Sequence, residues 1–311
     1  MLEIRNITLE GCDASGKSTL YSNIHRATKF RWNIQDRSQL SMLCYARQFG
    51  RGDEAIRKWR GELNDFLLDL NNRLIVLLPD FQVIAQRLQA RGDEFRDIDS
   101  LKVLHSIFEE EVARLGDRPN VLFVREPLSP EDLTNHCVTW LSKAELLEPL
   151  GAAREVKQLA ESLPSKEAVG CRFSFTIDPT SLSVPDASIL RHPPEEVYYA
   201  KILAGVLQNI DDELAGKNEY GVKQDAYTTR RFIFTQSSCI SLVHTVLRGD
   251  SLRMRVYCRS SDTRNTFSYD FQFICYLYSR VYSKLAARCG WSYPARGKFT
   301  IDVELGSAHI P

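Results

Sequence analysis

The chain has 311 residues, of which 43% are hydrophobic and 26% charged, and its 40 Lys and Arg residues balance 40 Asp and Glu residues. This length suits two domains, and the composition is that of a globular protein. Because the net charge is zero, the charge gives no support for DNA binding. No apolar run reaches the roughly 18 residues that span a bilayer, and the first residues do not resemble a signal peptide, so we expect a cytoplasmic protein without membrane contact.

The eight cysteines are scattered, and none forms a Cys-x-x-Cys pair. This spacing predicts reduced thiols and argues against a disulfide framework or a zinc site.

Along the first half, short apolar runs alternate with amphipathic stretches, which is the pattern of a layered α/β domain. The expected strands are Ile4–Leu9, Trp32–Gln35, Leu74–Leu78 and Asn120–Val124. The expected helices are Lys17–Thr28, Gln39–Gln48, Asp53–Asn71, Val83–Arg91, Ile98–Leu115 and Pro130–Leu141. These elements predict a three-layer nucleotide-binding domain over residues 1–165.

The second half begins after a polar helical stretch, Glu145–Ser165. It opens on a Ser-, Pro- and Asp-rich segment of little periodicity, Cys171–Pro194. We place the second domain at residues 166–311. Its expected elements are a helix at Glu195–Glu213, strands at Arg231–Thr235, Ile240–Leu247 and Leu252–Cys258, and an apolar helix at Phe271–Arg288.

The first motif that carries chemistry is a phosphate loop between an expected strand and an expected helix, with the Walker A spacing. Its glycines let backbone N–H groups surround phosphate oxygens, and the helix that follows presents its positive end. Lys17 supplies a charge for the β and γ phosphates, and Ser18 would ligate Mg²⁺. We therefore expect ATP and Mg²⁺ to bind at Gly11, Asp13, Ser15, Gly16, Lys17, Ser18 and Thr19.

The string Glu-Gly-x-Asp-x-x-Gly-Lys-Ser-Thr resembles thymidylate kinases and related nucleoside monophosphate kinases. The resemblance continues at Asp36-Arg37-Ser38, where that family carries an Asp-Arg-Tyr/Ser motif at a strand end. It implies that Asp36 meets magnesium, that Arg37 meets the substrate's phosphate, and that both act with Lys17 in catalysis. It also implies a nucleoside monophosphate as the acceptor.

Arg87 and Arg91 follow the expected strand Leu74–Leu78 and resemble the arginine-bearing lid of the same family. The resemblance places them at the ATP phosphates, whereas helical periodicity alone would allow a solvated helix face. Only residues 20–35 separate the phosphate loop from Asp36, and thymidylate kinases have a longer stretch there that carries part of the substrate pocket.

A second motif lies in the other half. Cys239 is followed 20 residues later by Arg259-Ser260-Ser261-Asp262, and Asp270 comes eight positions after Asp262. This spacing resembles thymidylate synthase and the pyrimidine hydroxymethylases, and the resemblance covers about residues 195–311. It implies an α+β domain, a homodimer whose twin arginines cross to the partner subunit, and pyrimidine nucleotide binding by Arg230, Arg231, Arg259, Ser260, Asp270 and His309.

In that family a cysteine thiolate adds to C6 of the pyrimidine, and C5 then attacks the one-carbon unit of methylenetetrahydrofolate. The resemblance therefore implies Cys239 and Asp262 as catalytic residues and methylenetetrahydrofolate as a cofactor. An Asp at position 270 can accept from the exocyclic amine of cytosine, so cytosine is favoured over uracil.

The sequence departs from this family around the cysteine. Ser238 and Ile240 replace the usual Pro and His, His244 replaces a Gln, and Cys258 precedes Arg259 where Gln is usual. Several aromatic residues and cysteines are interpreted as core residues: Phe271, Phe273, Tyr276, Tyr278, Tyr282, Cys44, Cys137, Cys275 and Cys289.

The preferred interpretation is a bifunctional enzyme in which a nucleotide kinase is fused to a deoxycytidylate hydroxymethylase-like domain. Phages with modified cytosine carry both activities, which would place the protein in a host cytoplasm. One alternative is a kinase of a modified base within DNA. Another is a kinase with a degenerate synthase-like domain used for dimerisation or nucleotide sensing.

Overall fold

A computed structural model of the chain describes residues 1–91, 97–147, 149–177, 196–249, 251–290 and 298–311. It divides into two compact units, Ile4–Leu146 and Leu147–Pro311, with Met1–Glu3 belonging to the second. The division precedes the expected boundary because helix α7 (Pro149–Ser162) packs against strands of the second unit. Met1–Glu3 joins the same unit through backbone pairing, with the Glu3 N–H donating to Ser174 O at 3.1 Å.

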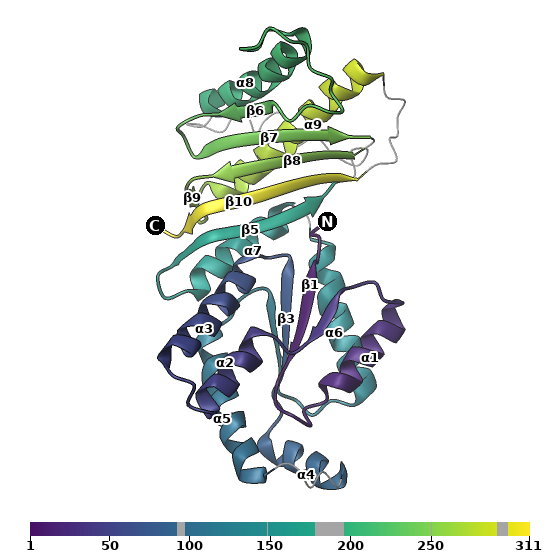
Figure 1. The fold of residues 1–311 in the computed structure, drawn as a ribbon, viewed down its shortest axis with the longest axis vertical. Coiled ribbons are helices and arrows are strands. Elements are labelled where there is room, and N and C mark those ends of the chain that lie inside the picture. The colour runs from purple at the N-terminus through teal and green to yellow at the C-terminus, as the bar shows by residue number, and fades with distance from the viewer. Residues whose placement is uncertain (92–96, 148, 178–195, 250, 291–297) are drawn as a thin grey trace. The chain divides into compact units, whose positions relative to one another are not determined.

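The first unit contains a parallel four-stranded sheet in the order β2-β1-β3-β4 (Figure 1). Its strands are β1 (Asn6–Glu10), β2 (Ile34–Asp36), β3 (Asn72–Leu77) and β4 (Val121–Val124). Its helices are α1 (Lys17–Thr28), α2 (Gln39–Gln48), α3 (Asp53–Leu68), α4 (Phe81–Arg91), α5 (Ile98–Leu115) and α6 (Pro130–Glu145). Each strand and helix expected from the sequence of this unit is present.

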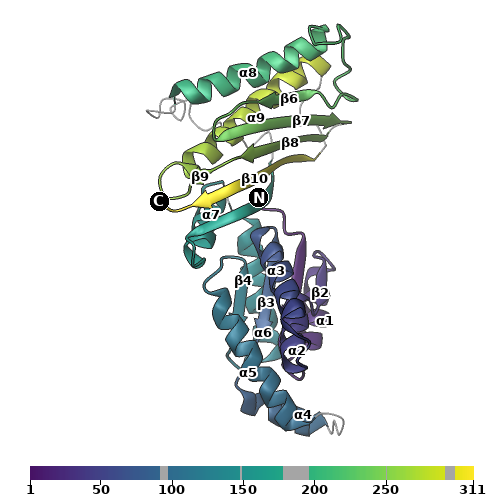
Figure 2. The ribbon, with the colours of Figure 1, turned by 60° about the vertical axis from the view of Figure 1, so that its left-hand side comes forward.

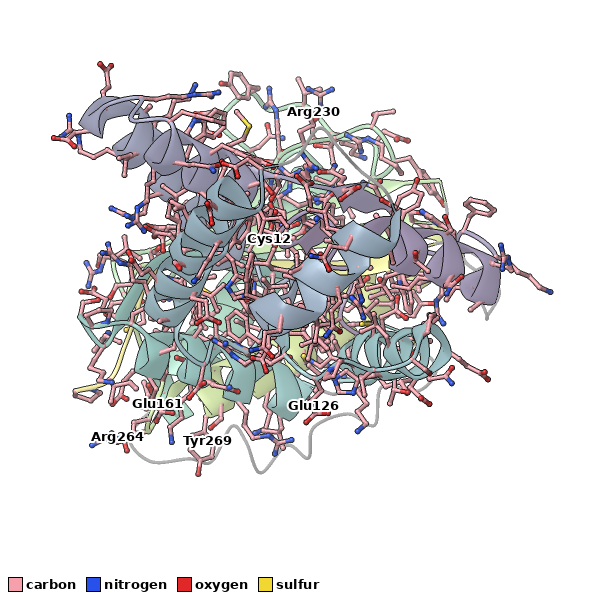
Figure 3. The ribbon with its side chains drawn as sticks, turned by 90° about the horizontal axis from the view of Figure 1, so that it is seen from below. Cys12, Glu126, Glu161, Arg230, Arg264 and Tyr269 are labelled. Carbon is pink, nitrogen blue, oxygen red and sulfur yellow. The ribbon has the colours of Figure 1, made fainter. Side chains whose placement is uncertain are left out.

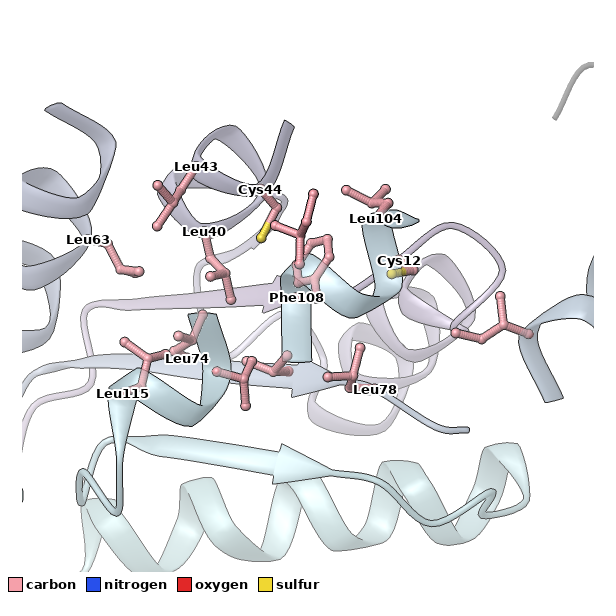
Figure 4. Packing of buried hydrophobic residues seen from close by; sticks show 14 of the residues in the cluster. Cys12, Leu40, Leu43, Cys44, Leu63, Leu74, Leu78, Leu104, Phe108 and Leu115 are labelled. Carbon is pink, nitrogen blue, oxygen red and sulfur yellow. The ribbon is translucent and has the colours of Figure 1, made fainter. Parts of the chain in front are cut away.

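The central strand β3 is buried along its whole length, as a parallel strand covered on both faces must be. Leu74 and Val76 face one apolar cluster, which α2, α3 and α5 complete (Figure 4). Ile75 and Leu77 face a second cluster, which α1 and α6 complete. The unit is therefore the expected three-layer α/β arrangement, with the sheet between two layers of helices.

The second unit contains a mixed sheet in the order β5-β10-β8-β7-β6, with β9 paired to β10. Strand β10 is parallel to β8 and antiparallel to β5, and β7 is antiparallel to both of its neighbours. The strands are β5 (Glu167–Thr176), β6 (Phe232–Thr235), β7 (Ile240–Arg248), β8 (Ser251–Cys258), β9 (Ser261–Asp262) and β10 (Phe299–His309). The helices besides α7 are α8 (Glu196–Ala215) and α9 (Phe267–Cys289).

Strand β8 shows how this sheet is covered. Its residues alternate strictly between buried and exposed, with Met254 and Val256 inside and Arg253, Arg255 and Tyr257 outside. Helix α9 crosses the inner face (Figures 1 and 2), and its Tyr278 hydroxyl donates to Leu252 O at 2.9 Å. The aromatic residues of α9 interpreted as core are all buried, as are Cys44, Cys137 and Cys275, while Cys289 is half-buried. None of the described helices is long and apolar enough to cross a membrane.

Three strands of the second unit, β5, β10 and the two-residue β9, were not expected from the sequence. The segment Cys171–Pro194 was interpreted as irregular, but β5 runs through it to Thr176, and residues 178–195 lie outside the described part. Strand β10 was missed as well. Both are long strands with polar residues on one face, and Gly170 and Gly306 interrupt their alternation.

Candidate active site

The phosphate loop connects the end of β1 to the start of α1, and backbone geometry fixes its glycines. Gly11 has φ +134°, and a Cβ there would lie 2.1 Å from the carbonyl oxygen of Leu77. Gly16 precedes the first residue of α1 with φ +108°. Both conformations favour glycine, so the loop can turn tightly against β3 and leave the N-terminal N–H groups of α1 facing it.

Lys17 is held inside this loop. Its Nζ donates to the carbonyl oxygens of Gly11 and Cys12, both at 2.7 Å, and the residue is only 5% exposed. Burial lowers the pKa of Lys17 and the charge of Arg37 lowers it further, whereas Asp13 and Asp36 raise it. The ammonium group therefore lies among carbonyl and carboxylate oxygens at the position where a loop of this kind binds phosphates.

The Asp-Arg motif lies beside the phosphate loop because β2 pairs with β1. Asp36 is opposite Leu9 in the ladder, and the Arg37 N–H donates to Leu9 O at 3.0 Å. The Arg37 guanidinium contacts the Asp13 carboxylate at 2.5 Å and lies over the ring of Tyr45, 5.9 Å from its centroid. Two sequence motifs that are separate along the chain thus form one cluster of alternating charge.

Glu10 is a site residue to which the sequence interpretation gave no role. Its carboxylate is fully buried and accepts from the backbone N–H of Ser38 at 2.7 Å and of Ser41 at 3.1 Å, and from both serine hydroxyls. Burial raises the pKa of Glu10, and these hydrogen bonds offset part of the rise. The carboxylate ties β1 to the start of α2 and so holds the turn at Arg37. Two features of the sequence could have indicated this role: the position of Glu10 directly before Gly11, and the Ser-x-x-Ser spacing of Ser38 and Ser41.

A cavity of about 160 Å³ opens on the outer side of the phosphate loop. The Arg87 Nη1 donates to Ser15 O at 2.9 Å, so this arginine contacts the loop, and its role at the ATP phosphates stays a prediction. Arg91 ends α4, and its side chain lies outside the described part. Ser129 caps α6 and fixes the segment that forms an apolar wall. The cavity is lined by Ala14, Ser15, Gly16, Thr19, Leu20, Arg87, Leu128, Pro130 and Leu133.

The expected magnesium ligands are oxygen donors on two exposed positions. Ser18 is the second residue of α1, and Asp36 ends β2. No group of three or more His, Cys, Asp or Glu residues in the described chain could hold a metal by itself. One hydroxyl and one carboxylate fit Mg²⁺, which keeps several waters and takes further oxygens from substrate phosphates.

In the second unit, several expected residues lie at one edge of the sheet. Cys239 precedes β7, Arg259 follows β8 and His309 ends β10, and the strand directions bring these three positions together. The Arg259 N–H donates to Cys239 O at 2.8 Å, and Ser260 Oγ lies 3.4 Å from His309 Nδ1. Among the described cysteines, Cys239 is the exposed one.

Asp270 lies on the first turn of α9 and is buried, with its Oδ1 accepting from the Tyr199 hydroxyl at 2.9 Å. Burial raises the pKa of the neighbouring Tyr198, and the charges of Asp270 and Cys239 raise it further. The Asp270 carboxylate and the Cys239 thiol therefore both lie close enough to Tyr198 to change its pKa.

Other expected residues are not gathered at this edge. The Asp262 carboxylate accepts hydrogen bonds from Arg264 and Asn265 within its own turn. Burial raises the pKa of Asp262, but these hydrogen bonds outweigh burial, so the pKa is lowered overall. Arg231 lies over the ring of Tyr220, 4.1 Å from its centroid, and Arg230 is exposed (Figure 3). Both arginines precede β6, whose first residue, Phe232, pairs with Thr245 of β7, six positions along the chain from Cys239.

No family model and no curated protein sequence matches the chain. Among solved structures, the YorR protein from Bacillus subtilis in complex with phosphorylated GDP aligns with 46% of this chain and 99% of its own, at 18% identity and a TM-score of 0.38. A deoxyadenosine kinase from M. mycoides with dCMP and dCDP bound aligns with 44% of this chain and 99% of its own, at 13% identity and a TM-score of 0.35.

Replacing Gly11 by Ala should damage the phosphate loop. The added Cβ would collide with the Leu77 carbonyl at an unfavourable φ, so we expect a loss of about 1–3 kcal/mol in unfolding free energy and loss of ATP binding. Gly61→Ala is the control, since nothing lies within 4 Å of a Cβ there and α3 should gain up to about 1 kcal/mol. Urea unfolding and ATP titration measure both effects. Wild-type ATP affinity in Gly11→Ala would contradict the loop geometry.

Proposed function

We propose that the first unit is an ATP-dependent nucleotide kinase. The observation that carries the proposal is the cluster in which Lys17, inside the phosphate loop, lies in one charge network with Asp36 and Arg37 from the neighbouring strand. Phosphoryl transfer needs positive charge around the γ-phosphoryl group and little other chemistry from the protein.

The cavity beside the loop suits the base of the ATP donor. Leu128, Pro130 and Leu133 offer an apolar wall to a planar ring, and Arg87 lines the same cavity while donating to the phosphate loop. Mg²⁺ held through Ser18 and Asp36 would neutralise charge on the phosphates.

In the proposed reaction an acceptor oxygen attacks the γ-phosphorus, and the bond from phosphorus to the bridging oxygen of ADP breaks. Lys17 and Arg37 stabilise the charge that spreads over the transferring group. Arg37 contacts Asp13 at 2.5 Å in the structure, so it must exchange this carboxylate for the substrate's phosphate.

The proposed acceptor is a nucleoside monophosphate, because the Asp36-Arg37 motif resembles that of nucleoside monophosphate kinases. The alternative acceptor is a modified base within DNA, which the short connection over residues 20–35 would leave room for. The zero net charge of the chain gives this alternative no support.

Lys17→Ala should lower phosphoryl transfer by at least about 100-fold, because the charge that stabilises the transferring group is lost. Lys102→Ala, which removes an exposed lysine of α5, is the control. The measurement is transfer from labelled ATP to mononucleotides and, separately, to duplex DNA. Unchanged turnover in Lys17→Ala would contradict the proposal, and transfer to duplex DNA alone would favour the alternative acceptor.

For the second unit we propose thymidylate synthase-type transfer of a one-carbon unit to a pyrimidine monophosphate, with cytosine favoured. What supports this is the exposed thiol of Cys239 at one sheet edge with Arg259, Ser260 and His309, together with the buried carboxylate of Asp270. An exposed thiol beside polar side chains is accessible for nucleophilic attack.

In this reaction the thiolate of Cys239 would bond to C6 of the pyrimidine and make C5 a carbon nucleophile, and loss of the C5 proton with expulsion of the thiolate would restore the ring. Methylenetetrahydrofolate, when bound, would supply the one-carbon unit that C5 takes up, and water would supply the oxygen of the hydroxymethyl group. Asp270 would accept from the exocyclic amine of cytosine. The competing interpretation, a degenerate domain for dimerisation or nucleotide sensing, is favoured by Asp262, whose carboxylate is used by its own turn.

Cys239→Ala should abolish the gain of one hydroxymethyl group, because no other described thiol is exposed in this structure. Cys289→Ala, at a half-buried position, is the control. The protein is incubated with dCMP, dUMP or dTMP, ATP and methylenetetrahydrofolate, and the products are identified by mass. If every activity survives in Cys239→Ala, the degenerate-domain interpretation replaces this proposal.

A homodimer is proposed for the second unit, because Arg230 and Arg231 directly precede Phe232, which pairs with Thr245, six positions along the chain from Cys239. The synthase resemblance assigns arginines of this kind to the nucleotide phosphate in a partner's site. The outer face of β8, with Arg253, Arg255 and Tyr257 exposed, is available for such contact. We expect sedimentation to detect a dimer that persists on dilution. A stable monomer would remove the phosphate-binding role of both arginines.

A further inference from the structure

We propose that Tyr198 and Tyr199, adjacent residues on α8, are positioning residues for the second unit's site. Tyr198 positions the segment that carries Cys239, and Tyr199 positions the carboxylate of Asp270. This inference rests on the proposed one-carbon transfer and adds two residues to it that no sequence motif indicated.

Tyr199 is bound to α9 at two points. Its ring stacks on Phe273, with centroids 4.4 Å apart and an interplanar angle of 18°, and its hydroxyl donates to Asp270 Oδ1 at 2.9 Å. Tyr199 is fully buried, and Asp270 is only 4% exposed. A buried phenol that donates to a carboxylate limits the rotation of that carboxylate. An acceptor of fixed direction is what recognition of an exocyclic amine requires.

Tyr198 acts on the other half of the site. Its hydroxyl oxygen accepts from the Ile240 N–H at 2.6 Å, and Ile240 is the residue directly after Cys239. The ladder between β7 and β8 is irregular from Ile240 to Leu242, so this amide has a side-chain partner at the point where the strand starts. The phenol oxygen of Tyr198 accepts this bond through a lone pair. Burial raises the pKa of Tyr198, so the side chain stays a neutral phenol.

The two tyrosines can serve two elements because successive residues of a helix point in directions about 100° apart. Their rings lie close to each other, with centroids 5.4 Å apart. One turn of α8 therefore sets where the Cys239 segment and the Asp270 carboxylate lie relative to each other. A thiolate that must reach C6 while a carboxylate binds the amine of the same ring depends on this relative position.

The test uses the full chain and three variants that each remove one tyrosine hydroxyl. Tyr199→Phe keeps the ring stack and loses the bond to Asp270, whereas Tyr198→Phe loses the bond to Ile240. Tyr278→Phe is the matched control, because its buried hydroxyl donates to Leu252 O at 2.9 Å and contacts neither Cys239 nor Asp270. The readouts are kcat and KM for dCMP and dUMP, thermal unfolding, and hydrogen exchange of the Ile240 amide.

We expect Tyr199→Phe to lower the ratio of kcat/KM for dCMP to that for dUMP by about tenfold, as loss of one oriented polar contact does. Tyr198→Phe should lower kcat for both nucleotides by about tenfold with little change in KM, and should speed exchange at Ile240. Tyr278→Phe should lower the unfolding temperature about as much as the other two substitutions do, because each removes one hydroxyl. It should leave the ratio of kcat/KM for dCMP to that for dUMP unchanged.

The outcomes separate the inference from the function it rests on. If the wild type transfers a one-carbon unit but Tyr199→Phe leaves the ratio unchanged, or Tyr278→Phe shifts it equally, the role of Tyr199 is overturned. Unchanged kcat and Ile240 exchange in Tyr198→Phe overturn the role of Tyr198. If the wild type neither binds nor modifies any of these nucleotides, the proposed function fails, and the base-recognition role of Tyr199 fails with it.

Discussion

The first unit depends on how closely its phosphate loop approaches β3. Gly11 lies where a Cβ would be 2.1 Å from the Leu77 carbonyl oxygen, so the loop leaves the sheet at the carboxyl ends of parallel strands without a side chain between them. Directly before it, the buried carboxylate of Glu10 binds the start of α2 through Ser38 and Ser41. These two contacts fix the loop on one side and Arg37 on the other, which is why a lysine and an arginine from separate motifs share one charge network.

The second unit assembles its site in a different way. Its candidate residues come from strand ends that meet at one sheet edge and from the first turn of α9, and they are connected by single hydrogen bonds. Cys239 lies just before β7, and its segment is held by the hydrogen bond from the Ile240 N–H to the Tyr198 hydroxyl. Tyr198, which is half-buried, and Tyr199, which is buried, therefore hold the segments of this site in place, as Gly11 and Glu10 hold the phosphate loop.

The sequence predicted the first unit well because its signals are local. A buried parallel strand such as β3 is a continuous apolar run, and the caps at Asp97 and Ser129 mark where α5 and α6 begin. In the second unit β5 and β10 were missed, since each pairs with partners far away along the chain. The motif spacing of Cys239 also could not reveal Tyr199, because a contact between α8 and α9 has no signature in sequence distance.

The two proposed activities, taken together, have a chemical order. Transfer at C5 acts on a monophosphate that arginines hold by its 5′-phosphate, and the kinase reaction lengthens that same phosphate chain. A site that recognises a terminal monophosphate by bidentate arginine contacts loses this geometry once a second phosphate is attached. In the proposed scheme, modification of the base would precede phosphorylation, and the product of the second unit would be a substrate for the first. On this order the kinase must accept a pyrimidine enlarged at C5, so selectivity in the first unit would come from phosphate recognition by Arg37 more than from the base.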